Sequence, residues 1–186
     1  FGATVATAEK GRGSQIEAGV RKLDTDWVLI LHSDCVLHRN AVEEISLLDG
    51  FVVGGACGQR FRPGNPVLTV VEFMNEGRAV HGESYWGDQG QFFRKDCQRV
   101  WIGLAEYPLM EDVEISRRLR QAGETRYLGL ETLAGTRKWK SGKRGKRFLL
   151  VFRLVIKFRI ASFLGKGPKV VQQMYDEYYR QGVEDY

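Results

Sequence analysis

The segment from Trp27 to Asp34 constrains the fold more than any other part of this 186-residue chain. An apolar run of strand length, Trp27–Leu31, is followed by a polar end that closes with a carboxylate. A continuous apolar run bounded by polar residues is typical of a strand buried on both faces of a parallel sheet. Ligands bind beyond the carboxyl ends of such strands, so we expect Asp34 at the mouth of a site, where it can hold a divalent cation. The alternative is that Asp34 only caps a turn or the next helix.

The patterns around this strand predict strands that alternate with helices. In order, we expect a strand over 3–8, a flexible basic turn over 9–15, helices over 15–23 and 40–48, a strand over 50–58, a helix over 67–80, a strand over 87–94, and helices over 111–123, 148–164 and from 171 onward. This order indicates a parallel sheet with crossover helices. Because the chain opens at Phe1 with a segment typical of a domain interior, we expect it to be part of a longer protein.

Composition narrows the class of protein. The net charge of +5 and the sequence pI of about 9.2 favour anionic partners, which include nucleotides, phosphates, nucleic acid and anionic lipid. The three cysteines, Cys35, Cys57 and Cys97, form no Cys-x-x-Cys pair, so we expect neither a zinc site nor disulfides. The sequence shows no signal peptide and no apolar span long enough to cross a bilayer, which predicts a cytoplasmic location.

Two adjacent carboxylates, Glu111 and Asp112, begin a predicted helix. At a helix N-terminus one can orient the segment while the other faces a cleft as a general base. The alternative is that both acids only complement the helix dipole.

A second polar group, Asp88 and Gln89, lies between Gly87 and Gly90. Glycines allow a backbone to approach a ligand closely, and Asp and Gln side chains can bind sugar hydroxyls. A turn at the end of a strand would explain the same residues. His32 is a further candidate ligand beside Asp34, although a histidine there is more often structural.

The composition turns basic from Arg137 to Arg147, with Trp139 among the cations. Such a loop can close over a diphosphate, bind a nucleic-acid backbone, or remain a solvated loop. The following segment, 148–164, is apolar but interrupted by cations about one turn apart. This spacing predicts an amphipathic helix that packs on its own domain, with peripheral contact to an anionic membrane as the alternative.

Several of these motifs occur together, in the order seen in one known family: Gly11–Gln15, Leu29–Cys35, Gly87–Gln89, Pro108–Glu114, Arg117–Arg120 and Thr136–Trp139. Together they resemble family 2 glycosyltransferases of the GT-A fold. The similarity is to the branch with a His-Ala-Asp-Thr form of the acidic motif, some members of which are labelled arsenosugar-biosynthesis transferases. It extends over nearly the whole chain. The family's N-terminal nucleotide-binding unit would precede Phe1, so base-binding residues are not assigned.

The resemblance implies an α/β fold with a mixed, mostly parallel sheet flanked by helices. It implies a transferase domain over residues 1–146 and a C-terminal helical extension over 147–186. It also implies transfer of a sugar from a nucleotide-diphosphate donor to an acceptor hydroxyl, with inversion, in a hexosyltransferase-like reaction. Nucleic acid is then not an expected partner.

The resemblance also implies residue roles. Asp34 matches the acid that holds Mn²⁺ or Mg²⁺ on the donor diphosphate, and His32 stands where the family has its first acid. Asp112 matches the catalytic base, with Glu111 in support. The residues matched to donor or acceptor binding are His32, Gly87, Asp88, Gln89, Arg137, Trp139 and Arg12. The alternative function is a non-catalytic basic module that docks on anionic membrane or nucleic acid.

Overall fold

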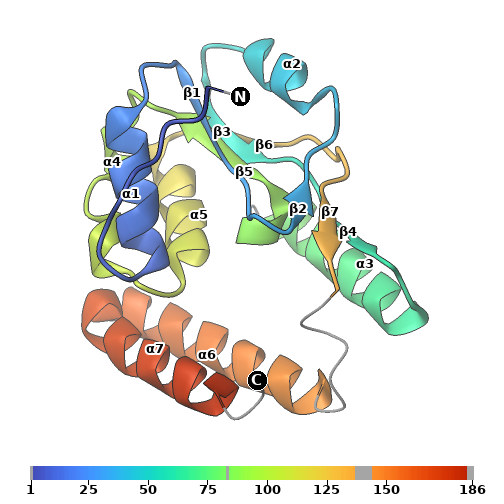
Figure 1. Ribbon diagram of the computed structural model, residues 1–186, viewed down its shortest axis with the longest axis vertical. Helices are drawn as coiled ribbons and strands as arrows, with labels where there is room; N and C mark the ends of the chain where they lie inside the picture. The colour runs from blue at the N-terminus through green and yellow to red at the C-terminus, as the bar shows by residue number, and fades with distance from the viewer. Residues whose placement is uncertain (1, 83, 137–143, 184–186) are drawn as a thin grey trace. The chain divides into compact units, whose positions relative to one another are not determined.

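The computed structural model describes residues 2–82, 84–136 and 144–183 (Figure 1). The chain divides into two compact units, each built from separate segments. The sheet unit contains Leu23–Trp101 and Asp112–Lys140, and the helical unit contains Phe1–Lys22, Ile102–Glu111 and Ser141–Tyr186. The sequence predicted a boundary after residue 146, whereas this division groups the first 22 residues with the C-terminal helices.

The sheet unit has a mixed α/β architecture, which confirms the predicted α/β class. Its strands are β1 (Trp27–Ile30), β2 (Cys35–Val36), β3 (Val52–Ala56), β4 (Arg60–Arg62), β5 (Gln91–Arg94), β6 (Glu124–Tyr127) and β7 (Leu133–Gly135). Its helices are α2 (Ala41–Ser46), α3 (Pro66–Gly82), the 3-10 helix η1 (Gly87–Gln89), α4 (Gln98–Trp101) and α5 (Glu111–Ala122), whose first residue belongs to the helical unit.

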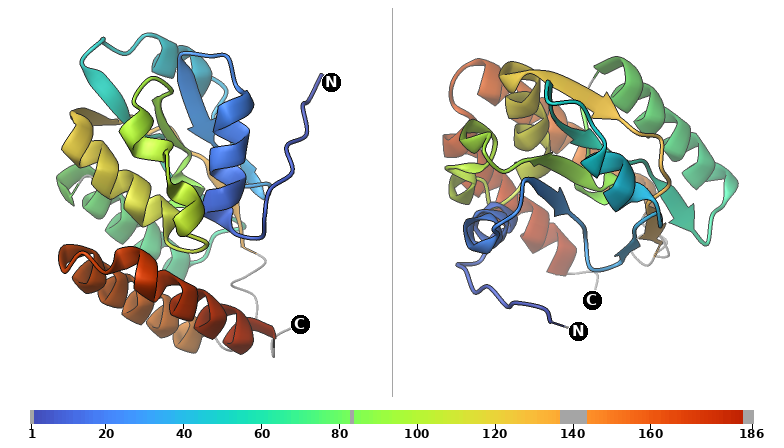
Figure 2. Two further views of the ribbon diagram at one scale, coloured as in Figure 1. Left: turned by 90° about the vertical axis from the view of Figure 1, so that its left-hand side faces the viewer. Right: turned by 90° about the horizontal axis from the view of Figure 1, so that it is seen from above.

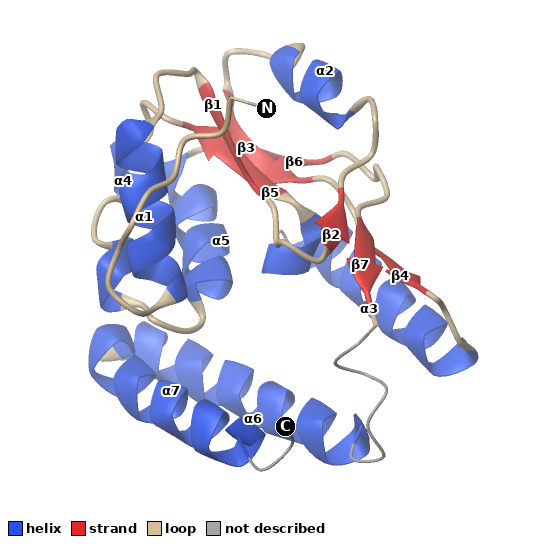
Figure 3. Ribbon diagram, in the orientation of Figure 1, coloured by secondary structure: helices blue, strands red, loops and turns tan. Residues whose placement is uncertain are grey.

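The strands form two mixed sheets, drawn in red in Figure 3. The four-stranded sheet has the order β1-β5-β3-β6, and the three-stranded sheet has the order β2-β7-β4. β5 is antiparallel to both β1 and β3, and only β3–β6 is a parallel pair in the larger sheet. The prediction of a mostly parallel sheet is therefore wrong. β5 enters between β1 and β3 in the reverse direction, and the hydrophobic pattern of a strand does not encode its direction.

Helices cover both faces of the four-stranded sheet. On one face, Ala41 and Ile45 of α2 form a buried cluster with Cys57 and Phe92. On the other, Leu119 of α5 is fully buried, and a Cβ atom at Gly54 of β3 would lie 2.6 Å from its Cδ2 atom. The sequence predicted helices over 40–48, 67–80 and 111–123, and α2, α3 and α5 confirm them. Asn40 occupies the N-cap of α2, but its side chain makes no capping hydrogen bond.

One predicted strand is wrong, and another is shorter than predicted. Residues 3–8 are exposed and form no strand, because the described chain offers no neighbouring strand to satisfy their backbone groups. Residues 87–94 divide into η1 and the shorter β5, because the backbone N–H of Gln89 bonds to Trp86 O at 3.0 Å and closes a turn.

The helical unit contains α1 (Arg12–Lys22), the 3-10 helix η2 (Leu104–Glu106), α6 (Arg144–Phe163) and α7 (Gly167–Val183). Of the flexible turn predicted over 9–15, the part from Arg12 to Gln15 is instead the first turn of α1. The N–H groups of Arg12 and Gly13 are bonded to Pro108 O and Tyr107 O, at 3.3 and 3.2 Å, which fixes this end of the helix.

The two long helices of this unit, α6 and α7, lie side by side (Figures 1 and 2). Leu154 and Phe158 of α6 and Val171 and Met174 of α7 are buried. Within the described residues, none of the helices combines the length and the apolar character that crossing a membrane requires.

Candidate functional site

Asp34 lies in a tight turn between β1 and β2. The N–H of Cys35 bonds to His32 O at 3.0 Å, so the polar end of the Trp27–Asp34 segment is a turn and not a continuation of the strand. The backbone of Asp34 is fixed because its carbonyl accepts a 3.1 Å hydrogen bond from Gly135 N of β7. The carboxylate is exposed, and among the described residues its hydrogen-bond donor is Cys35 Sγ, 4.0 Å from Oδ1. The turn therefore positions this carboxylate without using it as a cap.

Gly87 connects this turn to the start of α5. A Cβ atom at position 87 would lie 2.5 Å from Nε2 of His32, so the imidazole packs directly on the glycine backbone. The N–H of Gly87 donates to Oδ2 of Asp112 at 3.0 Å. His32, Gly87 and Asp112, which sequence reasoning selected separately, therefore form one cluster in the sheet unit.

A buried network of hydrogen bonds fixes the backbone carbonyl of Asp112. The amide of Gln91 donates to the Asp112 carbonyl at 2.9 Å and to the Tyr85 carbonyl at 3.1 Å. The hydroxyl of Ser116 also bonds to the Asp112 carbonyl, at 3.0 Å, and accepts from Tyr85 N at 2.9 Å. These contacts fix the backbone from which the Asp112 carboxylate projects.

The carboxylate itself is held by backbone groups. Oδ1 of Asp112 accepts from Val113 N at 2.8 Å, and Oδ2 accepts from Gly87 N. In the part of the chain that the structure describes, no Lys or Arg forms an ion pair with Asp112. Each oxygen keeps a lone pair, so the group can still accept a proton.

The neighbouring acid, Glu111, is described with the helical unit. Its side chain is only 2% exposed, and Oε1 lies 3.5 Å from Nη1 of Arg12. Met110, just before it, has a φ of 63°, a left-handed conformation that a side chain rarely adopts. Such strain persists only where the surrounding structure imposes it, and it is common at functional sites. Arg12, predicted as a donor- or acceptor-binding residue, is thus paired with Glu111.

A metal at this site would depend on Asp34. Groups of three or more His, Cys, Asp or Glu that could hold a metal do not occur among residues 2–82, 84–136 and 144–183. Mg²⁺ commonly binds through one or two carboxylates together with substrate phosphates. The single exposed carboxylate of Asp34 fits a cation that arrives with a diphosphate, and it does not fit a cage built from protein ligands alone.

Asp88 and Gln89 belong to a second network, centred on α3. The amide of Gln59 donates to Asp88 Oδ2, and Asn75 donates to Gln59 Oε1 at 2.7 Å. Arg78 donates to Gln89 Oε1 at 3.3 Å and to Asn75 Oδ1 at 3.4 Å. Gln89 is fully buried, so these contacts shape η1 from inside the sheet unit.

Sequence reasoning missed the residues of α3 that build this network. Asn75 and Arg78 lie three residues apart on the helix face that also buries Leu68 and Ala79. Polar residues at helical spacing on an otherwise apolar buried face are the signal that could have identified them. Arg78 also stacks on Trp86, with its Cζ atom 4.2 Å from the ring centroid.

Arg137 and Trp139 lie outside the described residues, so their predicted roles stay predictions.

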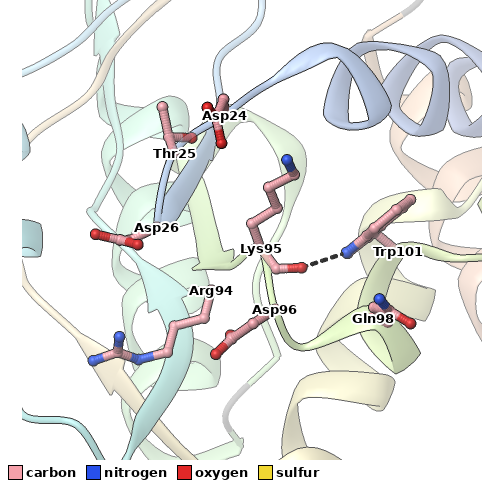
Figure 4. A pocket seen from close by; sticks show the side chains of 8 residues that line it. All are labelled: Asp24, Thr25, Asp26, Arg94, Lys95, Asp96, Gln98 and Trp101. Carbon is pink, nitrogen blue, oxygen red and sulfur yellow. Dashed lines mark hydrogen bonds between the residues drawn. The ribbon is translucent and has the colours of Figure 1, made fainter.

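A polar pocket of about 430 Å³ lies at the opposite end of β1 and contains none of the predicted site residues (Figure 4). Its cations already have structural roles. Arg94 stacks on Trp27 at 4.5 Å and donates to Val52 O at 2.9 Å, and Lys95 donates to Leu23 O. The Lys95 carbonyl accepts from the Trp101 indole at 2.9 Å. The pocket is a by-product of these strand-end contacts, and we assign it no function.

The chain matches no protein-family model and no curated protein sequence.

Proposed function

We propose that this chain is the catalytic part of a glycosyltransferase, of the family 2 type with a GT-A fold, that moves a sugar from a nucleotide-diphosphate donor to an acceptor hydroxyl. The observation that carries the proposal is the cluster of His32, Gly87 and Asp112, with Asp34 in the same turn as His32. Asp112 is a carboxylate fixed by backbone N–H groups, and the turn that carries the exposed Asp34 carboxylate packs on the same glycine through His32. We infer that the two carboxylates suit a reaction that removes a proton and expels a diphosphate.

In this proposal Asp112 is the general base. It accepts the proton of the acceptor hydroxyl as that oxygen forms a bond to the anomeric carbon. The bond from this carbon to the diphosphate oxygen breaks, and the diphosphate leaves with the electron pair, so the configuration inverts. Positioned general bases contribute rate factors of about 10² to 10⁴.

Asp34 binds the donor side of the reaction. Asp34 would hold a divalent cation that arrives with the donor, and such a cation would supply charge stabilisation for the leaving diphosphate. Gly87 orients Asp112, and the Glu111–Arg12 pair supports the turn that leads into α5. Arg137 and Trp139 are proposed to contact the diphosphate and the donor.

The test is a screen of nucleotide-diphosphate sugars against the full-length protein, with calorimetry for binding and release of nucleoside diphosphate for turnover. We expect at least one donor to bind only with Mg²⁺ or Mn²⁺, and Asp34→Ala to remove that metal dependence. Asp49→Ala, at another exposed turn carboxylate, is the matched control and should bind like the unmodified protein. Failure of every donor to bind, or donor binding unaffected by chelation and by Asp34→Ala, would contradict the proposal.

A further inference from the structure

The outer face of α6 carries a continuous apolar stripe. Five exposed residues recur at helical spacing from the middle of this helix to the residue just after its end: Phe152 (54% exposed), Ile156 (44%), Ile160 (57%), Phe163 (90%) and Leu164 (59%). The opposite face, with Leu154, Phe158 and Ala161, is buried in the helical unit. The stripe is therefore not the core-facing side of the helix, and packing within the helical unit does not account for it.

Cations border this stripe on both sides. At 3.6 residues per turn, Arg153 and Lys157 fall along one edge and Arg159 along the other. All three side chains are exposed, and Lys166 and Lys169 follow beyond the end of the helix. From Thr132 to Tyr175 the sequence contains no Asp or Glu, so cations predominate along α6, although Arg153 forms an ion pair with Glu177 of α7.

We propose that the outer face of α6 binds the surface of an anionic lipid bilayer. Exposed apolar residues flanked by Lys and Arg are the pattern of a helix that lies in the membrane interface, with its apolar side among the acyl chains and its cations at the headgroups. The long stems of Lys157 and Arg159 allow their charges to reach the headgroups while the stripe is buried. The helix lies on the membrane and does not cross it. The proposal of membrane binding does not rest on the proposal of glycosyl transfer, so an experiment can contradict either one alone.

α3 provides the internal comparison. It also exposes apolar side chains, including Val70 (59%), Phe73 (77%) and Met74 (55%). Its exposed charged neighbour is Glu76, an acid, so this face lacks the complementarity to anionic lipid that α6 has. If exposed apolar area alone caused binding, the two faces would behave alike.

The test is co-sedimentation of the full-length protein with phosphatidylcholine vesicles that either contain or lack phosphatidylserine. We expect binding only with phosphatidylserine, weakened by salt. Phe163→Ser should lower the partition coefficient about tenfold, and Lys157→Gln about fivefold. Phe73→Ser on α3 is the matched control and should bind like the unmodified protein.

A second measurement does not depend on removing the stripe. In Phe163→Trp, we expect the additional Trp emission to shift to shorter wavelength when phosphatidylserine vesicles are added. Equal binding to both kinds of vesicle, equal loss from Phe73→Ser and Phe163→Ser, or no emission shift would overturn the proposal. Self-association abolished by Phe163→Ser in the absence of vesicle binding would assign the stripe to a second copy of the chain, and would also overturn it.

Discussion

The backbone N–H of Gly87 donates to Oδ2 of Asp112 at 3.0 Å, across 25 positions of sequence. The imidazole of His32 packs on the same glycine, because a Cβ atom at position 87 would lie 2.5 Å from Nε2 of His32. One backbone position thus fixes the proposed base and the turn that presents Asp34.

Gly87→Ala should disturb this cluster. The new methyl group overlaps the His32 ring, and the imidazole or η1 must move. We expect a loss of about 1–3 kcal/mol in the free energy of unfolding, as for other overpacked sites. Urea unfolding measures this change, and the rate of donor hydrolysis should fall with it.

Gly77→Ala is the control for Gly87→Ala. Gly77 lies inside α3, and a Cβ atom there meets nothing within 4 Å. Alanine in a helix interior should raise stability by about 0.5–1 kcal/mol. Equal stability of the two variants would show that the His32–Gly87 contact is not tight.

Glu114 should make the stability of the protein depend on pH in the acid range. Its side chain is 1% exposed and accepts hydrogen bonds from Arg117 at 2.6 and 2.8 Å and from Arg118 at 2.7 Å. Burial acts to raise the pKa of this carboxyl, but the hydrogen bonds and charges of the two arginines together outweigh burial, so the pKa lies below its ordinary value.

Because the pKa is lower in the folded state, Glu114 stabilises the protein fully above its unfolded pKa of about 4.3. This contribution disappears as the pH falls through the folded pKa. Glu114→Gln should lower the free energy of unfolding at neutral pH by about 1–3 kcal/mol. It should also flatten the acid slope, which urea unfolding at a series of pH values measures. Glu44→Gln, at an exposed acid of α2, should change neither, and a Glu114→Gln profile that matches it would contradict this assignment.

The rates at which the cysteines are alkylated test the site without an assay of turnover. Cys57 is fully buried, and burial raises the pKa of its thiol to about 11, so it should resist alkylation in the folded protein. Cys35 is partly exposed and lies 4.0 Å from Asp34 Oδ1. We expect iodoacetamide to modify Cys35 well before Cys57, and donor with Mg²⁺ to slow the reaction at Cys35.

Cys97 is the internal control, since it lies away from Asp34, at the end of β5. Its rate of alkylation should not respond to donor and Mg²⁺, and peptide mass spectrometry resolves all three sites. An unchanged Cys35 rate at saturating donor would count against a diphosphate beside Asp34.

Local pattern predicted most of the helices and the strand β1, which lies at an edge of the four-stranded sheet. Apolar residues at helical spacing predicted α2 and α5, and the apolar run from Trp27 predicted β1. The reversed direction of β5 could not be predicted, because direction depends on the partners a strand meets. Gly87–Gln89 was mistaken for strand because a three-residue 3-10 turn has no periodicity of its own.

The site was predictable as separate residues but not as a cluster. Asp112 stood out because it begins a helix, and Gly87 because it precedes a polar pair. Their hydrogen bond joins residues far apart in the sequence, and no local pattern shows it. The Asn75–Arg78 network was missed because α3 was interpreted only as a helix of mixed character, without separating its buried face from its exposed one.

The central claim is that Asp112 is the base for sugar transfer. The most direct test compares Asp112→Asn with the unmodified protein for donor affinity by calorimetry and for nucleoside diphosphate release in the presence of Mg²⁺. Asparagine keeps an oxygen for the Gly87 N–H but cannot take up the proton. The account predicts unchanged donor affinity and a rate at least about 100-fold lower. Turnover close to that of the unmodified protein, with the same donor affinity, would contradict it.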